Sequence, residues 1–329
     1  MKLIKIRATV KLLIEGLYDL NSYRRCAAFL GDAKAHRIGH LESDIIRRYH
    51  VIEKGLCMPD FRPRFGGDVV RQLMDCLLLW KEEGYELESC EQVSAAVVAL
   101  EQYRNLHERL GINVDDIISR DFLLDFSSVH SCVDSGVRSL PKQTSQNALA
   151  FSEFFLSRFS VRHFDCARLL SAETVLDAIK TARKTPSVCN RQAWRVHAYN
   201  GELKDSLLEI QNGNRGFGHQ IPMLLVITVD MALFTGVVER YQPWIDGGMF
   251  AMSLMLALHS LGVSSVALNW AVCHSSDTLL HCQGAIPDKE RVVMLLGCGY
   301  AHSDAKVPVS FRSSAESFFH DHTKPSPTK

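Results

Sequence analysis

The chain has 329 residues, more than one typical domain and fewer than three, so its length predicts about two domains. It carries 37 basic and 37 acidic side chains, and this balance argues against a dedicated nucleic-acid binder, which would show a basic excess. A hydrophobic content of 47% with 22% charged residues is ordinary for a globular protein and excludes wholesale disorder.

The ten cysteines are scattered along the chain, without a C-x-x-C pair and without histidine at zinc-finger spacing. In a sequence that shows no secretory signal, scattered cysteines predict reduced thiols in a cytoplasmic protein. We therefore expect no structural metal site and assign no metal ligand.

Apolar residues recur at helical spacing near the start of the chain, at Leu3, Ile6, Val10, Leu13, Ile14 and Leu17. Charged residues interrupt them and no small-residue cleavage site follows, so the segment does not resemble a signal peptide. The pattern predicts an amphipathic helix packed on its own domain. The alternative is a basic helix that lies on anionic lipid.

The stretch from Gly247 to Ser276 contains no Asp, Glu, Lys or Arg, which raises the question of a membrane span. Polar residues such as His259, Ser260 and Asn269 interrupt it. We interpret it as a buried helix, a stop at Gly262 and a buried strand. No integral membrane segment is expected.

Helical periodicity dominates the chain up to about residue 140, and a Ser-rich segment at 127–145 is typical of a connecting loop. Beyond it, helices and β-rich segments alternate. We predict a helix over 173–184 and strands over 194–199, 222–230 and 291–301. The expected organisation is a helical N-terminal region (1–145), an α+β domain (146–322) and a disordered tail (323–329).

Arg158, Ser160 and Arg162 occupy alternating positions, which face the same side in an extended segment. Two guanidinium groups beside a hydroxyl form a receptor for phosphate or another delocalised anion. The alternative is a solvated strand that carries arginines on its outer face.

The segment 185–194 lies between the predicted helix and the first strand, and Pro186 and Ser187 start its loop. Asn190 and Gln192 then present primary amides, which both donate and accept hydrogen bonds. Such groups suit the edge of a heteroaromatic ring. The alternative is a plain turn that Asn and Ser side chains close.

These motifs, taken in order, resemble the FMN-dependent nitroreductase family. The matched strings are R-x-S-x-R-x-F, P-S-x-x-N-x-Q-x-W, D-G-G-M-F-A-M-S-L-M-L-A-L-H-S-L-G, I-P and L-L-G-C-G-Y, followed by Arg312. The resemblance covers residues 151–319. It implies a nitroreductase-like α+β fold with a central, mostly antiparallel sheet flanked by helices, and a homodimer with FMN in the subunit interface.

The resemblance also implies roles for individual residues. Arg158 and Ser160 correspond to phosphate contacts, and Arg162 corresponds to the cation near the pyrimidine end of the flavin. The loop that a partner subunit lays against the cofactor corresponds to Pro186, Ser187 and Asn190.

Four later positions complete the implied cofactor site. Asn214 matches a flavin-contacting asparagine, and Arg312 matches a late basic residue that closes on the phosphate. Asn269 and Trp270 stand where the family often has an acidic residue and glycine beside the reactive nitrogen of the flavin. A backbone N–H there could still serve the flavin, but the indole would narrow the space for substrate.

The segment 47–67 resembles the region ahead of the nitroreductase domain in some bacterial members linked to surface-polysaccharide gene sets. Arg62 and Arg64 would there form an anion site or part of a lid. The alternative, which we favour, is a docking loop whose charges form ion pairs.

The implied activity is reduction of a small molecule with NADH or NADPH as co-substrate, or its oxidation by the flavin, and the resemblance of segment 47–67 suggests a place in surface-polysaccharide metabolism. Because FMN carries the chemistry in a ping-pong hydride transfer, no catalytic side chain is assigned. The alternative from another class is a flavin-binding or flavin-free scaffold that kept the fold.

Overall fold

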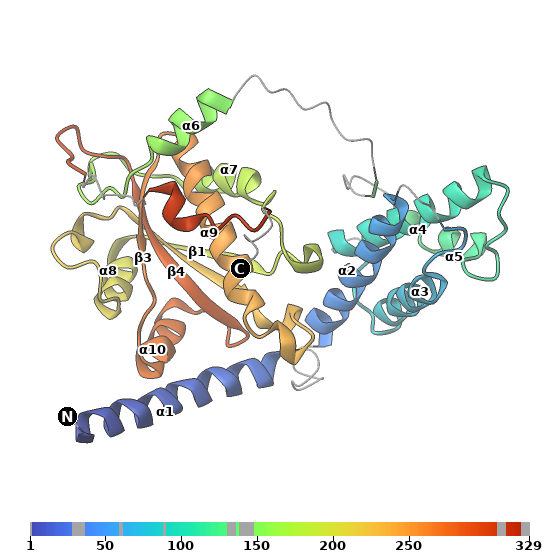
Figure 1. Ribbon diagram of the computed structural model, residues 1–329, viewed down its shortest axis with the longest axis horizontal. Helices are drawn as coiled ribbons and strands as arrows, with labels where there is room; N and C mark the ends of the chain where they lie inside the picture. The colour runs from blue at the N-terminus through green and yellow to red at the C-terminus, as the bar shows by residue number, and fades with distance from the viewer. Residues whose placement is uncertain are drawn as a thin grey trace, which may run out of the picture.

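The computed structural model describes residues 2–27, 37–58, 62–87, 90–129, 136–137, 148–307 and 314–323 (Figure 1). A bundle of helices occupies one end of the molecule and a sheet covered by helices occupies the other. The expected boundary at 145/146 lies outside the described residues, as do residues 324–329 of the expected tail, so these limits remain predictions.

Among the described residues, four helices form the bundle: α2 (Arg37–Leu56), α3 (Gly67–Glu82), α4 (Glu91–Arg109) and α5 (Arg120–Asp125), followed by the short η1 (Ser127–Val129). Their apolar faces enclose a separate core around Ile45, Leu73 and Leu100. Arg64 forms an ion pair with Asp116 at the end of this core. The geometry therefore supports the ion-paired docking loop over a free anion site at Arg64.

The sheet has four antiparallel strands in the order β1-β2-β4-β3. Their bounds are β1 (Trp194–Tyr199), β2 (Met223–Asp230), β3 (Ser264–Leu268) and β4 (Glu290–Gly299). Every residue of β2 is buried, because this central strand has a strand on each side and helices on both faces. The predicted strands thus lie at the predicted positions.

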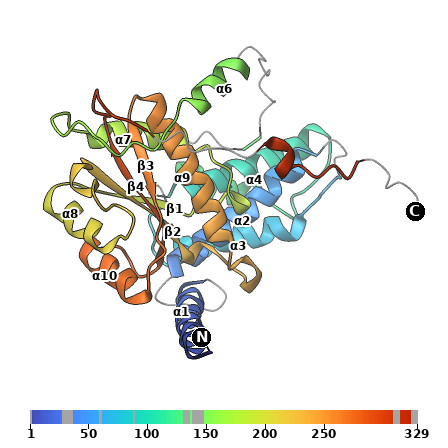
Figure 2. The same ribbon diagram turned by 60° about the vertical axis from the view of Figure 1, so that its left-hand side comes forward.

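Two layers of helices cover the sheet (Figure 2). Helices α7 (Ala172–Ala182) and α9 (Gln242–Ser260) pack on one face. Helices α8 (Gly201–Ile210) and α10 (His274–Gly284) pack on the other. The described residues also form α6 (Ala148–Leu156), η3 (Val188–Asn190), η4 (Gly218–Gln220), η5 (Met231–Leu233), η6 (Val237–Glu239) and η7 (Ala315–Phe318).

Helix α9 approaches the sheet closely because it presents small residues to it. A Cβ atom on Gly247 would lie 2.5 Å from Cγ2 of Val293, so only glycine fits there. One turn further, Phe250 stacks on Trp194 of β1 with ring centroids 4.7 Å apart. The helix ends before Gly262, which has a φ of +72° and leads into β3. Within the described ranges, no helix is long and apolar enough to cross a bilayer.

The first helix, α1 (Lys2–Cys26), is not part of the bundle. It lies against α10 and the start of β4, and its Tyr18 hydroxyl donates to Asp277 at 3.0 Å. The expectation that its apolar stripe packs on its own domain is wrong, because Ile6, Leu13 and Leu17 are exposed.

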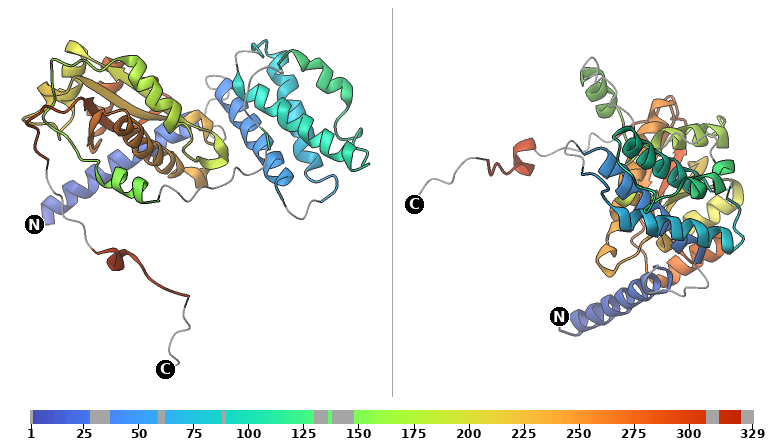
Figure 3. Two further views of the ribbon diagram at one scale, coloured as in Figure 1. Left: turned by 90° about the horizontal axis from the view of Figure 1, so that it is seen from above. Right: turned by 90° about the vertical axis from the view of Figure 1, so that its right-hand side faces the viewer.

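Helix α2 joins the bundle to the sheet domain (Figure 3). The buried Ser43 hydroxyl of α2 donates to the carbonyl oxygen of Leu233 in η5 at 2.8 Å. The same helix contacts η3, in the loop that precedes β1. The bundle therefore packs directly behind a loop that the sequence assigned to the cofactor.

Candidate functional site

The arginine strip, residues 158–162, lies along the edge strand β3. Ser160 forms a parallel bridge with Ser265, and the Val161 N–H donates to the Ser265 carbonyl oxygen at 3.1 Å. Val161 and Phe164, three residues apart, are both buried. The expected strict alternation therefore breaks after Val161, although the strip is extended enough to follow the sheet edge.

The two arginines of the strip remain available to bind an anion. Arg158 is half-buried, whereas Arg162 is exposed and lies 5.8 Å from the ring centroid of Phe217. Its guanidinium makes a long contact of 3.4 Å to the Ser160 carbonyl oxygen. Among the described residues, neither arginine forms an ion pair with a carboxylate. Uncompensated guanidinium groups beside the Ser160 hydroxyl match the donor set for a phosphate.

Asn214 lies in the turn after α8, where its amide is used locally. Its Nδ2 donates to the carbonyl oxygens of Leu208 at 2.6 Å and Gln211 at 2.9 Å. Gln211 in turn donates through Nε2 to the carbonyl oxygen of Asn269 at 3.0 Å. These bonds place Asn214 and Asn269 in one network. Asn269 is exposed, so its side-chain amide nitrogen could face a ligand, whereas the Asn214 side-chain oxygen lies against Gly218.

Trp270 directs its polar edge toward α10. Its Nε1 donates to Oδ1 of Asp277 at 2.7 Å, and its ring packs at the rim of the core beneath α8 and α10. Tyr18 of α1 donates to the other oxygen of the same carboxylate. The indole predicted to stand beside the flavin is therefore held in place through Asp277 of α10.

Residues 186–192, the amide loop, form a tight turn next to the bundle. Cys189, Asn190 and Gln192 all have positive φ values, between 50° and 55°. The Ser187 hydroxyl accepts the Gln192 N–H at 3.0 Å and closes the turn. Gln192 uses its own amide to donate to the Asn190 carbonyl oxygen at 3.2 Å. Left-handed backbone at three side-chain-bearing residues is costly and needs support from the surroundings.

That support comes from residues that the sequence did not single out. The side chain of Arg191 is fully buried and pairs with both carboxylate oxygens of Glu239, one of them at 3.0 Å. Arg191 also donates to the Leu233 carbonyl oxygen at 2.7 Å. Burial by itself would raise the pKa of Glu239, but hydrogen bonds from Arg191 and the Thr235 N–H lower it to about 2.

Asp246 of α9 is bonded to the loop, and Tyr49 of α2 lies beside it. The buried Asp246 carboxylate accepts the Val188 N–H at 3.1 Å and the Gln242 amide at 2.8 Å. It lies inside the first turns of α9. Burial raises the pKa of Asp246 and of the Tyr49 hydroxyl, which interacts with Asn190. No motif marked Tyr49, because only the packing of α2 brings it here.

The chain does not bring the arginine strip and the amide loop together. The strip is bonded to β3, whereas the loop is bonded to η5, η6 and α9. No hydrogen bond or ion pair joins the two segments within the described ranges. Pro186 is exposed and lines a cavity of about 370 Å³ between α6, α7 and α9. Arg312 lies outside the described residues.

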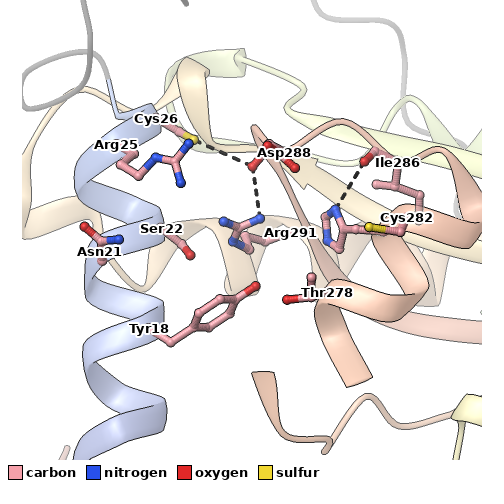
Figure 4. Close-up of a pocket in the computed structure, with 11 residues that line it drawn as sticks. Tyr18, Asn21, Ser22, Arg25, Cys26, Thr278, Cys282, Ile286, Asp288 and Arg291 are labelled. Carbon is pink, nitrogen blue, oxygen red and sulfur yellow. Dashed lines mark hydrogen bonds between the residues drawn. The ribbon is translucent and has the colours of Figure 1, made fainter. Parts of the chain in front are cut away.

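Two further cavities lie along α1, away from the strip. One of about 280 Å³ is bounded by α1, α10 and the turn before β4 (Figure 4). The other, of about 260 Å³, contains Trp270 and Trp244 together with Glu15 and Asp19 of α1. Both share Tyr18 and Arg291, so the polar side of α1 forms one wall of each.

Similarity to solved structures covers about half of the chain. A nitroreductase family protein from Streptococcus pneumoniae is 19% identical, with a TM-score of 0.45 over 52% of this chain and 100% of its own. A nitroreductase family protein from Clostridium difficile 630 is 20% identical, with a TM-score of 0.44 over 52% and 98%. An FMN-dependent nitroreductase from Clostridium difficile R20291 is 19% identical, with a TM-score of 0.41 over 54% and 98%. No match was found among curated proteins.

A family model described as the Nitroreductase family matches residues 156–214 and 207–300. This span begins just before the arginine strip and ends after β4, so it includes the strip, the amide loop and the whole sheet. The α+β architecture with its antiparallel sheet is the nitroreductase-like fold that the motifs predicted. Residues 156–300 of this chain therefore match the nitroreductase family in sequence and in fold.

Proposed function

We propose that this protein is a cytoplasmic, FMN-dependent oxidoreductase that uses NADH or NADPH to reduce a small molecule. The observation that carries the proposal is the pair of guanidinium groups, Arg158 and Arg162, which flank Ser160 on the sheet edge without an acidic partner among the described residues. A receptor for a phosphate dianion needs such uncompensated donors. Their position inside the family-matched span supports the phosphate of FMN as the anion.

The residues present fit FMN by the chemistry of their donors. Arg158 and Ser160 would hold the phosphate, and Arg162 would supply a cation for the pyrimidine end of the ring. Asn269 would contribute its exposed side-chain amide. When bound, FMN supplies a centre that accepts a hydride and passes it on. The protein itself would bind and orient the cofactor. The Arg162 guanidinium would stabilise the negative charge that develops at the pyrimidine end of the ring on reduction.

We propose that the amide loop completes the site of a second copy across a twofold axis. Support comes from its separation from the arginine strip in one chain and from its rigid hydrogen bonding. Tyr241, the N-cap of α9, and Ile245 and Met249 within α9 also form an exposed apolar row at four-residue spacing. A twofold homodimer buries the same patch on both copies, and it would place each loop opposite its partner's strip.

Cofactor binding tests the proposal directly. Purified protein is expected to be yellow, or to become yellow when FMN is added and excess FMN is removed. Under anaerobic conditions, NADH or NADPH should bleach the visible absorbance, and an added nitroaromatic or quinone should restore it. Protein that stays colourless after incubation with FMN would instead support the scaffold alternative.

A matched pair of variants locates the cofactor. Arg162→Ala should weaken FMN retention or slow the reductive step while the protein remains folded by circular dichroism. Arg183→Ala removes an exposed arginine at the end of α7 and should change neither property. Equal FMN occupancy and turnover in the Arg162→Ala variant and wild-type protein would reject the assigned site.

A further inference from the structure

Helix α1 packs on the rest of the chain through its polar side. Glu15 accepts the His274 N–H at 2.8 Å, and Tyr18 donates to Asp277 at 3.0 Å. Near the end of the helix, the Cys26 thiol contacts the Asp288 carbonyl oxygen at 3.7 Å. Figure 4 shows Tyr18, Ser22 and Cys26 on the side of α1 that faces α10 and β4.

The apolar side of α1 points away from the body. Six apolar side chains are 50% to 63% exposed: Ile6, Val10, Leu13, Ile14, Leu17 and Leu20. An amphipathic helix ordinarily buries such a stripe and exposes its polar face. Here the orientation is inverted, and Figure 3 shows the helix projecting from the sheet domain. An exposed row of this length on a soluble domain indicates an interaction surface.

The spacing of the stripe identifies the kind of partner. Ile6, Leu13 and Leu20 are seven residues apart, as are Val10 and Leu17, and the two sets alternate at spacings of four and three. This is the heptad pattern of two helices that pack side by side. Ile14 lies beside the seam and widens it.

We propose that α1 pairs with α1 of a second copy in an antiparallel orientation. In this orientation Ile6 meets Leu17 of the second copy and Val10 meets Leu13, so the stripe is complementary to itself. Its charges favour the same direction. Arg7 and Lys11 both lie in the first half of the helix, so antiparallel helices keep the two basic halves apart. Parallel helices would place Arg7 beside Arg7.

This pairing does not depend on the flavin. It adds a contact between two copies, whereas the proposed function rests on the arginine strip, which is bonded to β3 and lines neither cavity along α1. The contact at α1 is isologous, as a twofold axis requires, so it is compatible with the homodimer proposed above. Flavin content and α1 pairing can therefore fail separately.

Disulfide trapping in the full-length protein tests the pairing. The double variant Ile6→Cys/Leu17→Cys should form a covalent dimer under mild oxidation, because the new thiol at position 6 of one copy lies opposite the new thiol at position 17 of the second copy. The two positions of one helix are about 16 Å apart and cannot bridge internally, since a disulfide spans Cα atoms less than about 7 Å apart.

The single variants are the matched controls. Ile6→Cys alone and Leu17→Cys alone should stay at the wild-type level of crosslinking, whereas a mixture of the two should give the crosslinked dimer. Wild-type protein measures the background from the native cysteines. FMN absorbance recorded on each sample reports on the cofactor site independently.

Each outcome of these experiments decides for or against the antiparallel pair. Crosslinking of Ile6→Cys alone would indicate that the two α1 helices pack in parallel. A double variant that does not crosslink would show that the two α1 helices do not pack against each other. If the double variant does not crosslink, the protein should be tested for co-sedimentation with phosphatidylcholine–phosphatidylserine vesicles. Co-sedimentation that the Leu13→Asp variant loses would identify a lipid surface as the partner of the stripe. A covalent dimer confined to the double variant and the mixture would support the antiparallel pair.

Discussion

Arg191 and Glu239 form a bidentate ion pair beneath the amide loop, with the arginine side chain fully buried. The same arginine donates to the Leu233 carbonyl oxygen, and Glu239 also accepts the Thr235 N–H at 2.7 Å. One pair therefore ties the loop before β1 to the segment between β2 and α9. Because the loop contains three residues with positive φ, its shape depends on this anchor.

Removing one member of the pair should destabilise the protein. Arg191→Met leaves the Glu239 carboxylate without its cation, and we expect the free energy of unfolding to fall by about 3 kcal/mol. This is the lower end of the range for buried pairs, because Glu239 retains some contact with water. Urea denaturation measures the effect. A loss no larger than that of an exposed variant such as Arg183→Ala would contradict the anchoring role.

The same pair predicts a pH dependence. Because the folded protein holds the pKa of Glu239 at about 2, below its ordinary value of 4.5, the contribution is fully present above pH 4.5. It is lost as the pH falls from there through 2. Wild-type stability measured against pH should therefore decline more steeply in this window than that of the Glu239→Gln variant. If the stability of the two proteins changed equally with pH, the Arg191–Glu239 pair would not be the cause of the pH dependence.

Two adjacent glycines in α9 should respond oppositely to alanine. Gly247→Ala places a Cβ 2.5 Å from a Val293 methyl and should lower the free energy of unfolding by about 1–3 kcal/mol. Open space surrounds the point where a Cβ on Gly248 would lie, so Gly248→Ala should be neutral or stabilise the helix by up to about 1 kcal/mol. Thermal unfolding of both variants measures the difference. Similar shifts in the two proteins would contradict the close approach at Gly247.

Arg158 should contribute to cofactor affinity. Loss of one charge-assisted hydrogen bond to phosphate in Arg158→Ala should raise the Kd for FMN about tenfold to a hundredfold. Fluorescence quenching on titration of the apoprotein with FMN measures this value, and Arg183→Ala provides the control. If riboflavin, which lacks the phosphate, lost as much affinity as FMN, then Arg158 would not be a phosphate contact.

Mixed dimers should reveal a site shared between two copies. Arg158→Ala and Asn190→Ala homodimers would each carry a defect in both sites. After subunit exchange, a mixed dimer has one site with an intact strip and an intact loop, so about a quarter of all sites should regain high affinity for FMN. Recovery is measured as bound flavin after gel filtration. A mixture that binds no more FMN than its components would argue that one chain supplies both segments.

Cys273 should be a reactive thiol. Hydrogen bonds from the Ser275 hydroxyl and then the Ser276 N–H stabilise its thiolate and lower its pKa to about 6. Its alkylation by iodoacetamide, followed by mass spectrometry, should rise through pH 6 and level off near pH 7. Ser275→Ala should move the midpoint upward, with the exposed Cys282 of the same helix as the internal reference. An unchanged midpoint would exclude the hydroxyl as the cause.

The amino-acid sequence determined the elements that depend on local pattern. Continuous apolar segments gave β2 and β4, and the apolar run without charge gave α9, the stop at Gly262 and β3. The order of short motifs also determined the family, because Arg158, Ser160, Asn190 and Gln192 are neighbours in the chain and need no folded partner to be recognised.

Tertiary structure decided what surrounds those motifs. Tyr49 reaches Asn190, and Glu239 reaches Arg191, only because α2 and η6 pack against the amide loop. The orientation of α1 could not be predicted either, since periodicity gives the apolar stripe of a helix but not which side of the helix packs against the rest of the protein. The polar contacts of Glu15 and Tyr18 with α10 settled that orientation, because hydrogen bonds between elements depend on positions in space and not on spacing along the chain.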